Sequence, residues 1–328
     1  MSRPNSADNP VPIDATDPIT EPSTMLARLL RRLYLGQLLL GAALGYWAAS
    51  DAPSAAQRSL ALVLGALALP LALQAVILGT GMVWAHAGRL DRLAWRALWG
   101  EYRAAVRVFM LRMPWSWRAP DVLRPPKATA LPVLLVHGYG CNHRVWDELS
   151  ADLLAAGHPV LCVDLEPTFT GIDDYAAVLE QAVQRLMAAT GARRLAMVGH
   201  SMGGLAIRAW ARAHGHERVA CWLTLGTPHQ GTRIAHAAHT PNGVQMRWQS
   251  PWLRMLQATQ DPALARKLAI AITPQDNVVF PQRAQTLGTA PVTEFAGLGH
   301  LELALAPAVR QWVLQHLALN RPAHDTAA

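Results

Sequence analysis

The sequence predicts an α/β fold with a mostly parallel sheet of about six strands and helices on both faces, preceded by an N-terminal transmembrane helical hairpin. Two observations predict it. Short apolar runs alternate with helical stretches over residues 130–320, and two long uncharged runs precede them within residues 28–86. The composition agrees, because 52% of the 328 residues are hydrophobic and only 16% are charged. Soluble proteins carry about 25% charged residues, so this deficit favours a membrane-embedded part.

The two ends of the chain predict disorder. Residues 1–27 are rich in Pro, Asp, Ser and Thr and show no apolar period, which is typical of segments that cannot bury a core. Residues 321–328 form a second, shorter tail. We therefore expect the folded structure to lie between residues 28 and 320.

Residues 28–86 predict the transmembrane helical hairpin. Leu33–Ser50 and Leu60–Ala85 carry no charged side chain, and a bilayer span takes about 20 apolar residues. A signal peptide would begin with a short basic region, whereas a long tail comes first here. A pair of buried helices in a soluble protein is the alternative, but both runs are apolar on all sides rather than along one stripe.

Arginines around the hairpin predict its orientation. They flank its outer ends, at Arg28, Arg31 and Arg32 before the first run and at Arg89, Arg92 and Arg96 after the second. The connecting loop holds Arg58, which Asp51 offsets. Because basic residues stay on the cytoplasmic side, we expect an inner (cytoplasmic) membrane protein with both termini, and the domain that follows, in the cytoplasm.

Residues 87–129 predict a basic amphipathic helix and a proline-rich linker. On a helical wheel, the arginines from Arg89 to Arg107 fall in a sector of roughly 60°. One interpretation is an interfacial helix on anionic lipid. The other is a surface helix packed on the next domain, which Asp91 and Glu101 on or near the apolar side favour. Nucleic-acid binding is not expected, because no recognised module accompanies the charge.

Residues 130–320 predict alternating strands and helices. The apolar runs that we interpret as strands are 131–136, 159–164, 194–199, 219–225, 268–273 and 291–295. Helical stretches fill the gaps near 145–156, 173–190, 203–214 and 304–318. This alternation is typical of a parallel sheet with helices on both faces.

The motif that indicates chemistry is Gly199-His200-Ser201-Met202-Gly203. It follows a predicted strand and precedes a predicted helix, which is the context that a nucleophile elbow requires. A serine on such a strained turn needs neighbours two residues away that lack side chains, and Gly199 and Gly203 meet that demand. Ser201 is therefore the candidate nucleophile, and the following helix N-terminus favours a developing anion.

A second motif, His137-Gly138-Tyr139-Gly140, directly follows the first predicted strand and could present a backbone N–H to the same anion. Together, the two motifs resemble the α/β-hydrolase superfamily. Gly226-Thr227-Pro228-His229-Gln230-Gly231 is similar to a segment of bacterial triacylglycerol lipases and related esterases. The resemblance covers about residues 130–320 and does not extend to the hairpin.

The resemblance implies an oxyanion hole formed by the backbone N–H groups of Tyr139 and Met202, and a triad in the order Ser, acid, His. Asp276 lies in the loop after a later strand, where the acid is expected, and His300 follows the last strand. Asp261 and Asp164 are weaker candidates for the acid. His200 and His229 come too early in the chain for the base, so we expect structural hydrogen bonds from both.

Such a triad requires no metal or organic cofactor. Residues 227–267 are too long for a plain connection and are apolar, which predicts a lid-like insertion over the acyl pocket; an ordinary helix with a long lead-in is the alternative. The three cysteines, Cys141, Cys162 and Cys221, have the spacing of neither a disulfide framework nor a metal site.

The sequence therefore predicts a membrane-anchored serine hydrolase that cleaves lipid or long acyl esters. A thioesterase or an acyltransferase on the same triad is the alternative, because the sequence does not fix the acyl acceptor. A non-catalytic membrane protein with a hydrolase-like domain is a further alternative, but the intact set of Ser201, Asp276 and His300 argues against it.

Overall fold

The computed structural model describes residues 24–117 and 119–320. The predicted tail at residues 321–328 and most of the tail at residues 1–27 lie outside the described residues. The last residues of that N-terminal segment begin helix α1 (Met25–Ala48), and the Thr24 hydroxyl caps it by accepting the Ala27 N–H at 3.1 Å.

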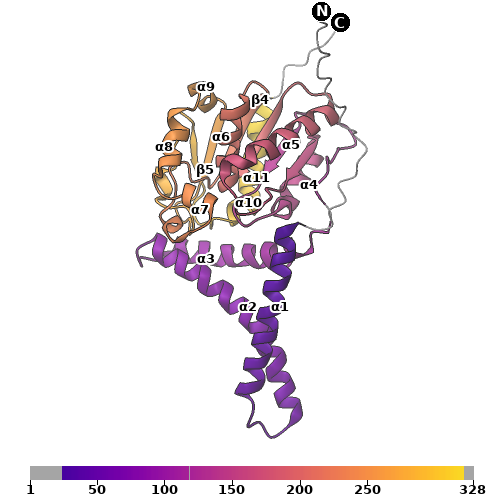
Figure 1. The fold of residues 1–328 in the computed structure, drawn as a ribbon, viewed down its shortest axis with the longest axis vertical. Helices are drawn as coiled ribbons and strands as arrows, with labels where there is room; N and C mark the ends of the chain where they lie inside the picture. Colours follow the sequence, from indigo (N-terminus) through magenta and orange to yellow (C-terminus); the bar gives the residue numbers. More distant parts are fainter. Residues whose placement is uncertain (1–23, 118, 321–328) are drawn as a thin grey trace, which may run out of the picture.

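A parallel sheet forms the centre of the larger domain (Figure 1), as the sequence predicted. Its strands are β1 (Val133–Val136), β2 (Val160–Val163), β3 (Leu195–His200), β4 (Val219–Leu225), β5 (Leu268–Ile272) and β6 (Val292–Glu294). The spatial order is β2-β1-β3-β4-β5-β6, and every neighbouring pair is parallel. All strands therefore end at the same edge of the sheet.

Helices cover both faces of this sheet, which is why strands such as β1, β2 and β5 are apolar throughout rather than alternating. The edge strand β6 is the exception, with Thr293 and Glu294 at least partly exposed. Val133 and Leu135 of β1 pack with α4 (Asp147–Ala155) and α11 (Pro307–Leu319). Leu134 and Val136 pack with α5 (Tyr175–Thr190) and α6 (Met202–His214) on the opposite face. Burial of each such side chain contributes about 1.5–3 kcal/mol.

Residues 227–267 lie between β4 and β5 and form a 3-10 helix, η5 (Arg233–Ala237), and three short α-helices at one side of the domain (Figure 1). These are α7 (Pro241–Gln245), α8 (Pro251–Ala258) and α9 (Pro262–Ala265). Each of these α-helices begins with proline. This position tolerates proline because an N–H in the first turn has no acceptor within the helix, so its absence costs no hydrogen bond. That this insertion acts as a lid stays a prediction.

Helices α1 and α2 (Ala55–Ala85) form a hairpin that projects from the domain (Figure 1). A capping box between Ser54 and Gln57 starts α2 after the short connecting turn. The two helices approach closely at glycines, because a Cβ on Gly41 or Gly65 would overlap backbone of the opposite helix. Close packing at small residues is the usual way that helices associate in lipid.

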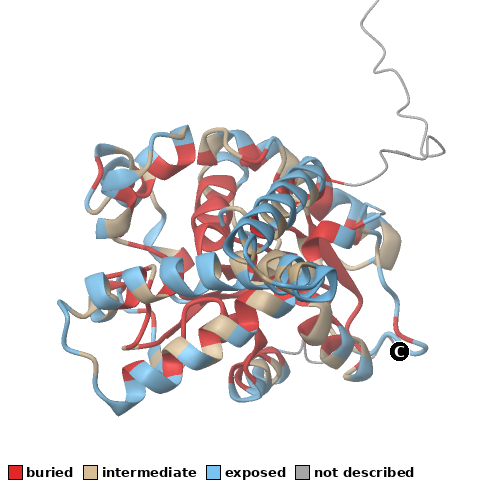
Figure 2. Ribbon diagram, turned by 90° about the horizontal axis from the view of Figure 1, so that it is seen from below, coloured by how far each residue is buried: buried red, intermediate tan, exposed pale blue. Residues whose placement is uncertain are grey.

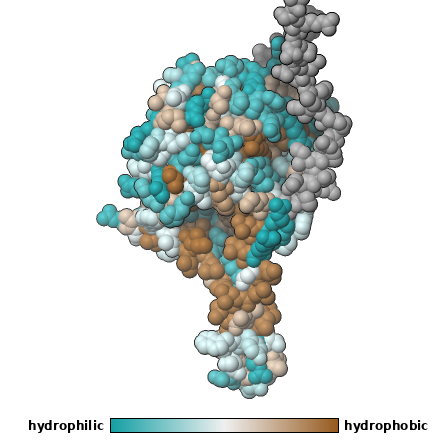
Figure 3. All heavy atoms as spheres, in the orientation of Figure 1, coloured by the Kyte–Doolittle hydropathy of each residue, from teal (hydrophilic) through white to brown (hydrophobic). Residues whose placement is uncertain are grey.

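The surface of the hairpin is apolar. Seen from below, most of it is exposed (Figure 2), and an apolar band separates the domain from a polar tip (Figure 3). Among residues 24–117 and 119–320, one helix, α2, is long and apolar enough to cross a membrane, with a mean hydropathy of 2.4 in its most apolar window. Only 6% of that window is buried, which distinguishes α2 from the core helix of a soluble protein.

Helix α3 (Arg92–Ala105) lies crosswise to the hairpin, beneath the domain (Figure 1). Its small residues face the protein, since Ala94, Ala97, Ala104 and Ala105 are buried. Its arginines and tryptophans are exposed at Arg92, Trp95, Arg96, Trp99 and Arg103. The two interpretations of this helix are therefore compatible, because one side of it packs on the protein and other sides remain exposed.

Two short turns, η1 (Val106–Met110) and η2 (Met113–Trp115), continue from α3 along the domain. Arg112, between them, pairs with Glu148 of α4 through two hydrogen bonds of 2.6 and 2.7 Å. Arg31 of α1 donates to the Pro114 carbonyl at 2.9 Å. A bidentate guanidinium–carboxylate pair is among the stronger polar contacts, so these bonds fix the N-terminal helices to the domain.

Candidate active site

Ser201 occupies a strained turn between β3 and α6. Its φ of 54° and ψ of −127° lie in a region that non-glycine residues rarely adopt, at a cost of about 1–3 kcal/mol. The Ser201 N–H donates to the Leu225 carbonyl of β4 at 2.8 Å, which holds the turn against the neighbouring strand. This is the geometry of a nucleophile elbow.

Glycines on both sides of the serine make the turn possible. A Cβ on Gly203 would overlap the carbonyl groups of Val136 and His137, and a Cβ on Gly199 would overlap the backbone of Gly204. The helix after the serine could not approach β1 with larger residues at these sites. The spacing in the motif therefore follows from the packing of α6 on the sheet.

His300 and Asp276 lie next to each other at the same edge of the sheet. His300 Nδ1 donates to Asp276 Oδ2 at 2.8 Å, and both side chains are buried. The second oxygen, Oδ1, accepts the N–H groups of Val278 and Val279 at 2.8 and 2.6 Å. Each carboxylate oxygen thus has its own hydrogen-bond donors, and these bonds hold the carboxylate in its orientation toward the imidazole.

The charge of Asp276 acts on the protonation of His300. Burial lowers the pKa of the imidazole, but the Asp276 carboxylate raises it through its charge and hydrogen bond, and the net direction is upward. The fixed Nδ1–H leaves Nε2 without a proton in the neutral ring. Nε2 is therefore the nitrogen that could accept a proton.

The turn that carries His300 sits against the nucleophile elbow. A Cβ on Gly226, which follows β4, would lie 3.2 Å from His300 Nδ1, so the ring packs on this glycine. The His200 ring lies 4.8 Å from the His300 ring, and His200 Nε2 donates to the His300 carbonyl at 3.0 Å. Since His200 immediately precedes Ser201, this bond joins the two loops.

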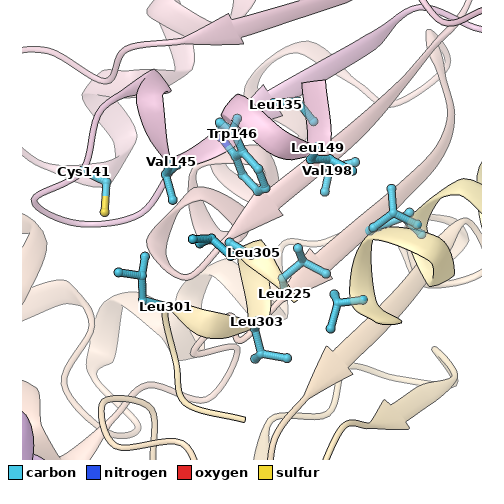
Figure 4. Close-up of a cluster of buried hydrophobic side chains, with 14 of the residues drawn as sticks. Leu135, Cys141, Val145, Trp146, Leu149, Val198, Leu225, Leu301, Leu303 and Leu305 are labelled. Carbon is cyan, nitrogen blue, oxygen red and sulfur yellow. The ribbon is translucent and has the colours of Figure 1, made fainter. Parts of the chain in front are cut away.

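A buried cluster supports the same turn from below. Leu301, Leu303 and Leu305 belong to the same buried cluster as Val198 of β3 and Leu225 of β4 (Figure 4). Protein interiors are close-packed, so a shift of the histidine turn would require this cluster to repack.

Of the two predicted oxyanion donors, Met202 follows Ser201 in the chain and Tyr139 follows Gly138, which approaches the serine. Met202 is the first residue of α6, and the N–H groups of a first helical turn have no intrahelical acceptor. Gly138 brings the loop after β1 to the serine, because a Cβ there would lie 2.8 Å from Ser201 Cβ. The next residue, Tyr139, holds its ring 5.4 Å from Phe169 and its hydroxyl 3.2 Å from Thr240 Oγ1 of the insertion.

The other acids and histidines have different partners. Asp261 is an exposed cap of α9 and pairs with His216 at 2.8 Å. Asp164 accepts from His143 Nδ1 at 2.8 Å. His229 shares a 3.0 Å hydrogen bond with Thr224 in the core, which is a structural role.

Two residues near His300 were not identified from the sequence. Asn277 Oδ1 accepts the His300 N–H at 3.2 Å, and the only sequence signal was its position beside Asp276. The Glu101 carboxylate of α3 accepts the N–H groups of Leu301 and Glu302 at 3.0 and 2.9 Å. Glu101 did stand out as an acid on the apolar side of a basic helix, but that signal did not indicate its partners.

The N-terminal helices dock at the edge of the sheet that carries these residues. Gly81 of α2 packs on Asn277, and the Trp84 ring lies 6.1 Å from Phe280 in the same loop. Thr24, at the start of α1, accepts from Asn142 after β1 at 3.4 Å. The hairpin therefore projects from the side of the domain on which Ser201 and His300 lie.

A parallel sheet in this order, with a serine on the turn after β3 and a histidine–carboxylate pair after the last strands, defines an α/β-hydrolase. The comparison of sequences agrees: the model of the Alpha/beta hydrolase family matches residues 133–325, and the chain belongs to this family.

Curated relatives are similar to part of the chain. A triacylglycerol lipase of Pseudarthrobacter phenanthrenivorans is 34% identical over 116 residues, which are 33% of this chain and 36% of that protein. A triacylglycerol lipase of Burkholderia plantarii is also 34% identical over 116 residues, 33% of this chain and 32% of that protein. The chain thus spans about a third of the length of these relatives.

Solved structures share the fold. The mature form of the Bacillus licheniformis lipase BlEst2 superposes with a TM-score of 0.51 at 17% identity, covering 61% of this chain and 96% of that one. Aspergillus fumigatus lipase B gives a TM-score of 0.51 at 15% identity, covering 62% of this chain and 57% of that one.

Proposed function

We propose that this protein is a membrane-anchored serine hydrolase that cleaves lipid or long acyl esters. The observation that carries the proposal is the joint position of Ser201, His300 and Asp276 at one edge of the sheet, the edge on which α1, α2 and α3 dock. Similarity to triacylglycerol lipases supports ester hydrolysis as the reaction type.

The proposed reaction uses these residues in turn. As the Ser201 Oγ attacks the acyl carbonyl, its proton passes to His300 Nε2, and Asp276 stabilises the resulting imidazolium. The N–H groups of Tyr139 and Met202 bind the oxyanion, each worth about 3 kcal/mol by analogy with other enzymes. His300 then donates the proton to the leaving alkoxide. A water, deprotonated by the same nitrogen, releases the acid and restores the serine.

The hairpin is the proposed anchor. An apolar band needs about 30 Å to cross the hydrocarbon of a bilayer, and α2 has 31 residues at about 1.5 Å each. The polar tip around Asp51 and Arg58 would then reach the far side. Arginines at the domain end, such as Arg32 and Arg89, support a cytoplasmic location for the hydrolase domain.

Helix α3 supports the same arrangement. Because it lies crosswise to the hairpin (Figure 1), it would lie in the plane of the membrane surface. The exposed rings of Trp95 and Trp99 and the exposed Arg92 and Arg103 are the side chains that favour the boundary between headgroups and acyl chains. The active-site edge would then face the bilayer, where long acyl esters reside.

The test is hydrolysis by the full-length protein in vesicles that contain anionic lipid. We expect turnover of long-chain diacylglycerol in the bilayer that exceeds turnover of a soluble acetyl ester, and no turnover by Ser201→Ala. Hydrolysis of thioesters alone, or acyl transfer to an added alcohol without free acid, would point to the alternative reactions and contradict the proposal.

The anchor has its own test. The full-length protein should remain in the membrane pellet after carbonate extraction, and protease added outside spheroplasts should leave the hydrolase domain intact. Release by carbonate would overturn the hairpin as an integral anchor. Cleavage of the domain from outside would overturn the orientation.

A further inference from the structure

Glu101 is a buried carboxylate on the side of α3 that faces the hydrolase domain. Its side chain is 2% exposed. Oε1 accepts the Leu301 N–H at 3.0 Å and Oε2 accepts the Glu302 N–H at 2.9 Å. These amides belong to the turn that leads from His300 into α10 (Glu302–Leu305). A residue outside the hydrolase family match at residues 133–325 therefore binds the backbone of that turn.

Every amide of this turn has a side-chain acceptor. The Gly299 N–H donates to Glu302 Oε2 at 3.1 Å, and the His300 N–H donates to Asn277 Oδ1 at 3.2 Å. The next two amides donate to Glu101. Glu101 is the only one of these acceptors that comes from the N-terminal helices, so it joins α3 to the histidine.

Two glycines allow the helix and the turn to come together. A Cβ on Gly299 would overlap the Glu101 side chain, and a Cβ on Gly100 would overlap the Glu302 carboxylate. The contact between α3 and the His300 turn is therefore so close that a side chain at Gly100 or at Gly299 would not fit. Such an approach fixes the distance between α3 and the His300 turn.

The charge of Glu101 also reaches His300. Burial raises the pKa of Glu101 to about 7, and the His300 charge opposes that rise. In return, the Glu101 carboxylate adds to the effect of Asp276 in raising the pKa of His300. No ion pair within 4.0 Å joins Glu101 to a basic side chain in the described part of the chain. A cation at His300 is thus the charge that Glu101 would stabilise.

The neighbouring Cys141 and His200 side chains carry no charge that could take over the electrostatic role of Glu101. Burial, with a contribution from the Glu101 charge, raises the pKa of Cys141 to about 12, so this thiol stays neutral. Burial lowers the pKa of His200 to about 3, so this ring stays neutral as well. The other charged groups that face the turn are Asp276, Glu302, and Arg96 and Arg103 beside Glu302.

We propose that Glu101 is a positioning residue for His300: it fixes the turn that carries the base and stabilises the imidazolium, so that the membrane-facing helix α3 forms part of the active site. This inference rests on the proposed triad. It predicts that removing the Glu101 charge makes His300 a weaker base even though Glu101 touches no reacting atom.

The informative variant is Glu101→Gln, which keeps the shape but offers one oxygen and one NH₂ to two N–H donors. The matched control is Glu148→Gln, which removes a carboxylate from the contact between Arg112 and α4. If Glu101→Gln does not fold, Glu101→Asp, which keeps the charge but retracts it by one methylene, tests the positioning of the turn: its backbone exchange at residues 299–302 should accelerate, and unchanged exchange there would overturn the proposal.

The first readout is deuterium exchange at the imidazole carbon of His300 as a function of pH, followed by mass spectrometry of the full-length protein in detergent. Because Glu101 raises the pKa of His300, its loss should shift the His300 titration to lower pH in Glu101→Gln, and Glu148→Gln should match the wild type. Backbone exchange at residues 299–302 should accelerate in Glu101→Gln. Glu101→Asp should retain a titration closer to that of the wild type while its backbone exchange accelerates.

The second readout is kcat/KM against pH. Activity requires neutral His300 and falls as pH drops through its pKa, so the acid limb of Glu101→Gln should move to lower pH. The maximum should fall about 10- to 100-fold, the size expected for a lost hydrogen bond to a charged group. An unchanged His300 titration in Glu101→Gln, or an equal shift in Glu148→Gln, would overturn the proposal. Lack of ester turnover by the wild type would overturn the proposed function instead, because the exchange measurement does not depend on turnover.

Discussion

Replacement of Asp276 by asparagine tests the assignment of the acid. In the structure, Oδ1 accepts two backbone N–H groups and Oδ2 accepts His300 Nδ1–H. An asparagine has one oxygen, and two donors at 2.8 and 2.6 Å will keep it where Oδ1 lies. Its NH₂ then faces His300 Nδ1 and donates to it. The neutral ring must carry its proton on Nε2, which can no longer accept the serine proton.

The expected loss is large. The same substitution lowers kcat about 10⁴-fold in serine proteases, which corresponds to about 5.5 kcal/mol at 1.36 kcal/mol per tenfold. Three hydrogen bonds fix the carboxylate here, so we expect a loss of the same order for Asp276→Asn. The assay is steady-state hydrolysis of a p-nitrophenyl ester by the detergent-solubilised full-length protein.

The control is Asp261→Asn, at the exposed cap of α9, where the carboxylate pairs with His216. This variant should retain wild-type kcat. If Asp276→Asn kept activity within about tenfold of the wild type, or if Asp261→Asn were the damaging change, the tautomer argument would be refuted.

Further predictions concern stability and pH. Ser201→Gly should abolish turnover yet raise Tm, because glycine relieves a turn that costs about 1–3 kcal/mol; an unchanged or lower Tm would contradict the strain. Gly65→Leu should lower Tm, because the larger side chain would separate α1 and α2. Gly79→Leu should leave Tm unchanged, because the space around Gly79 is open. The acid limb of wild-type kcat/KM should lie above the ordinary pKa of histidine, since the net shift of His300 is upward; a limb below it would argue against His300 as the base.

Local patterns were sufficient to predict the sheet. The central strands are short runs of apolar residues, and both faces of the sheet are covered, so a continuous apolar run was the right signal for them. The edge strand β6 (Val292–Glu294) is polar at two of its three positions. The turn around Ser201 was predictable for a similar reason, because the glycines that its packing requires are two residues away in the chain.

Contacts across long distances in the chain could not be predicted in this way. Glu101 lies 200 residues before Leu301, whose N–H it accepts. A carboxylate on the apolar side of a helix indicates that something polar lies opposite, but the partners are backbone amides, which every residue has. The interaction depends on how α3 docks on the domain. The side chains of Leu301 and Glu302 give no sign of it, because only their backbone N–H groups take part.

The two interpretations of α3 illustrate the same limit. Its helical period indicated one basic and one apolar side, and the structure packs Ala104 and Ala105 on the domain and Ala97 on Met82 of α2. The exposed Trp95 and Trp99 lie on other sides of the same helix. The helical wheel presented packing on the domain and contact with lipid as alternatives. One helix can combine the two, because its different sides can face the protein and a lipid surface at the same time.

The most direct test of the account is to label membranes that contain the full-length protein with a fluorophosphonate and to map the adduct by mass spectrometry. We predict one adduct, on Ser201, in the carbonate-resistant pellet, and no adduct in Ser201→Ala. An adduct on a different residue, or no labelling of a folded wild-type protein, would contradict the claim that Ser201 is the nucleophile of a membrane-anchored hydrolase.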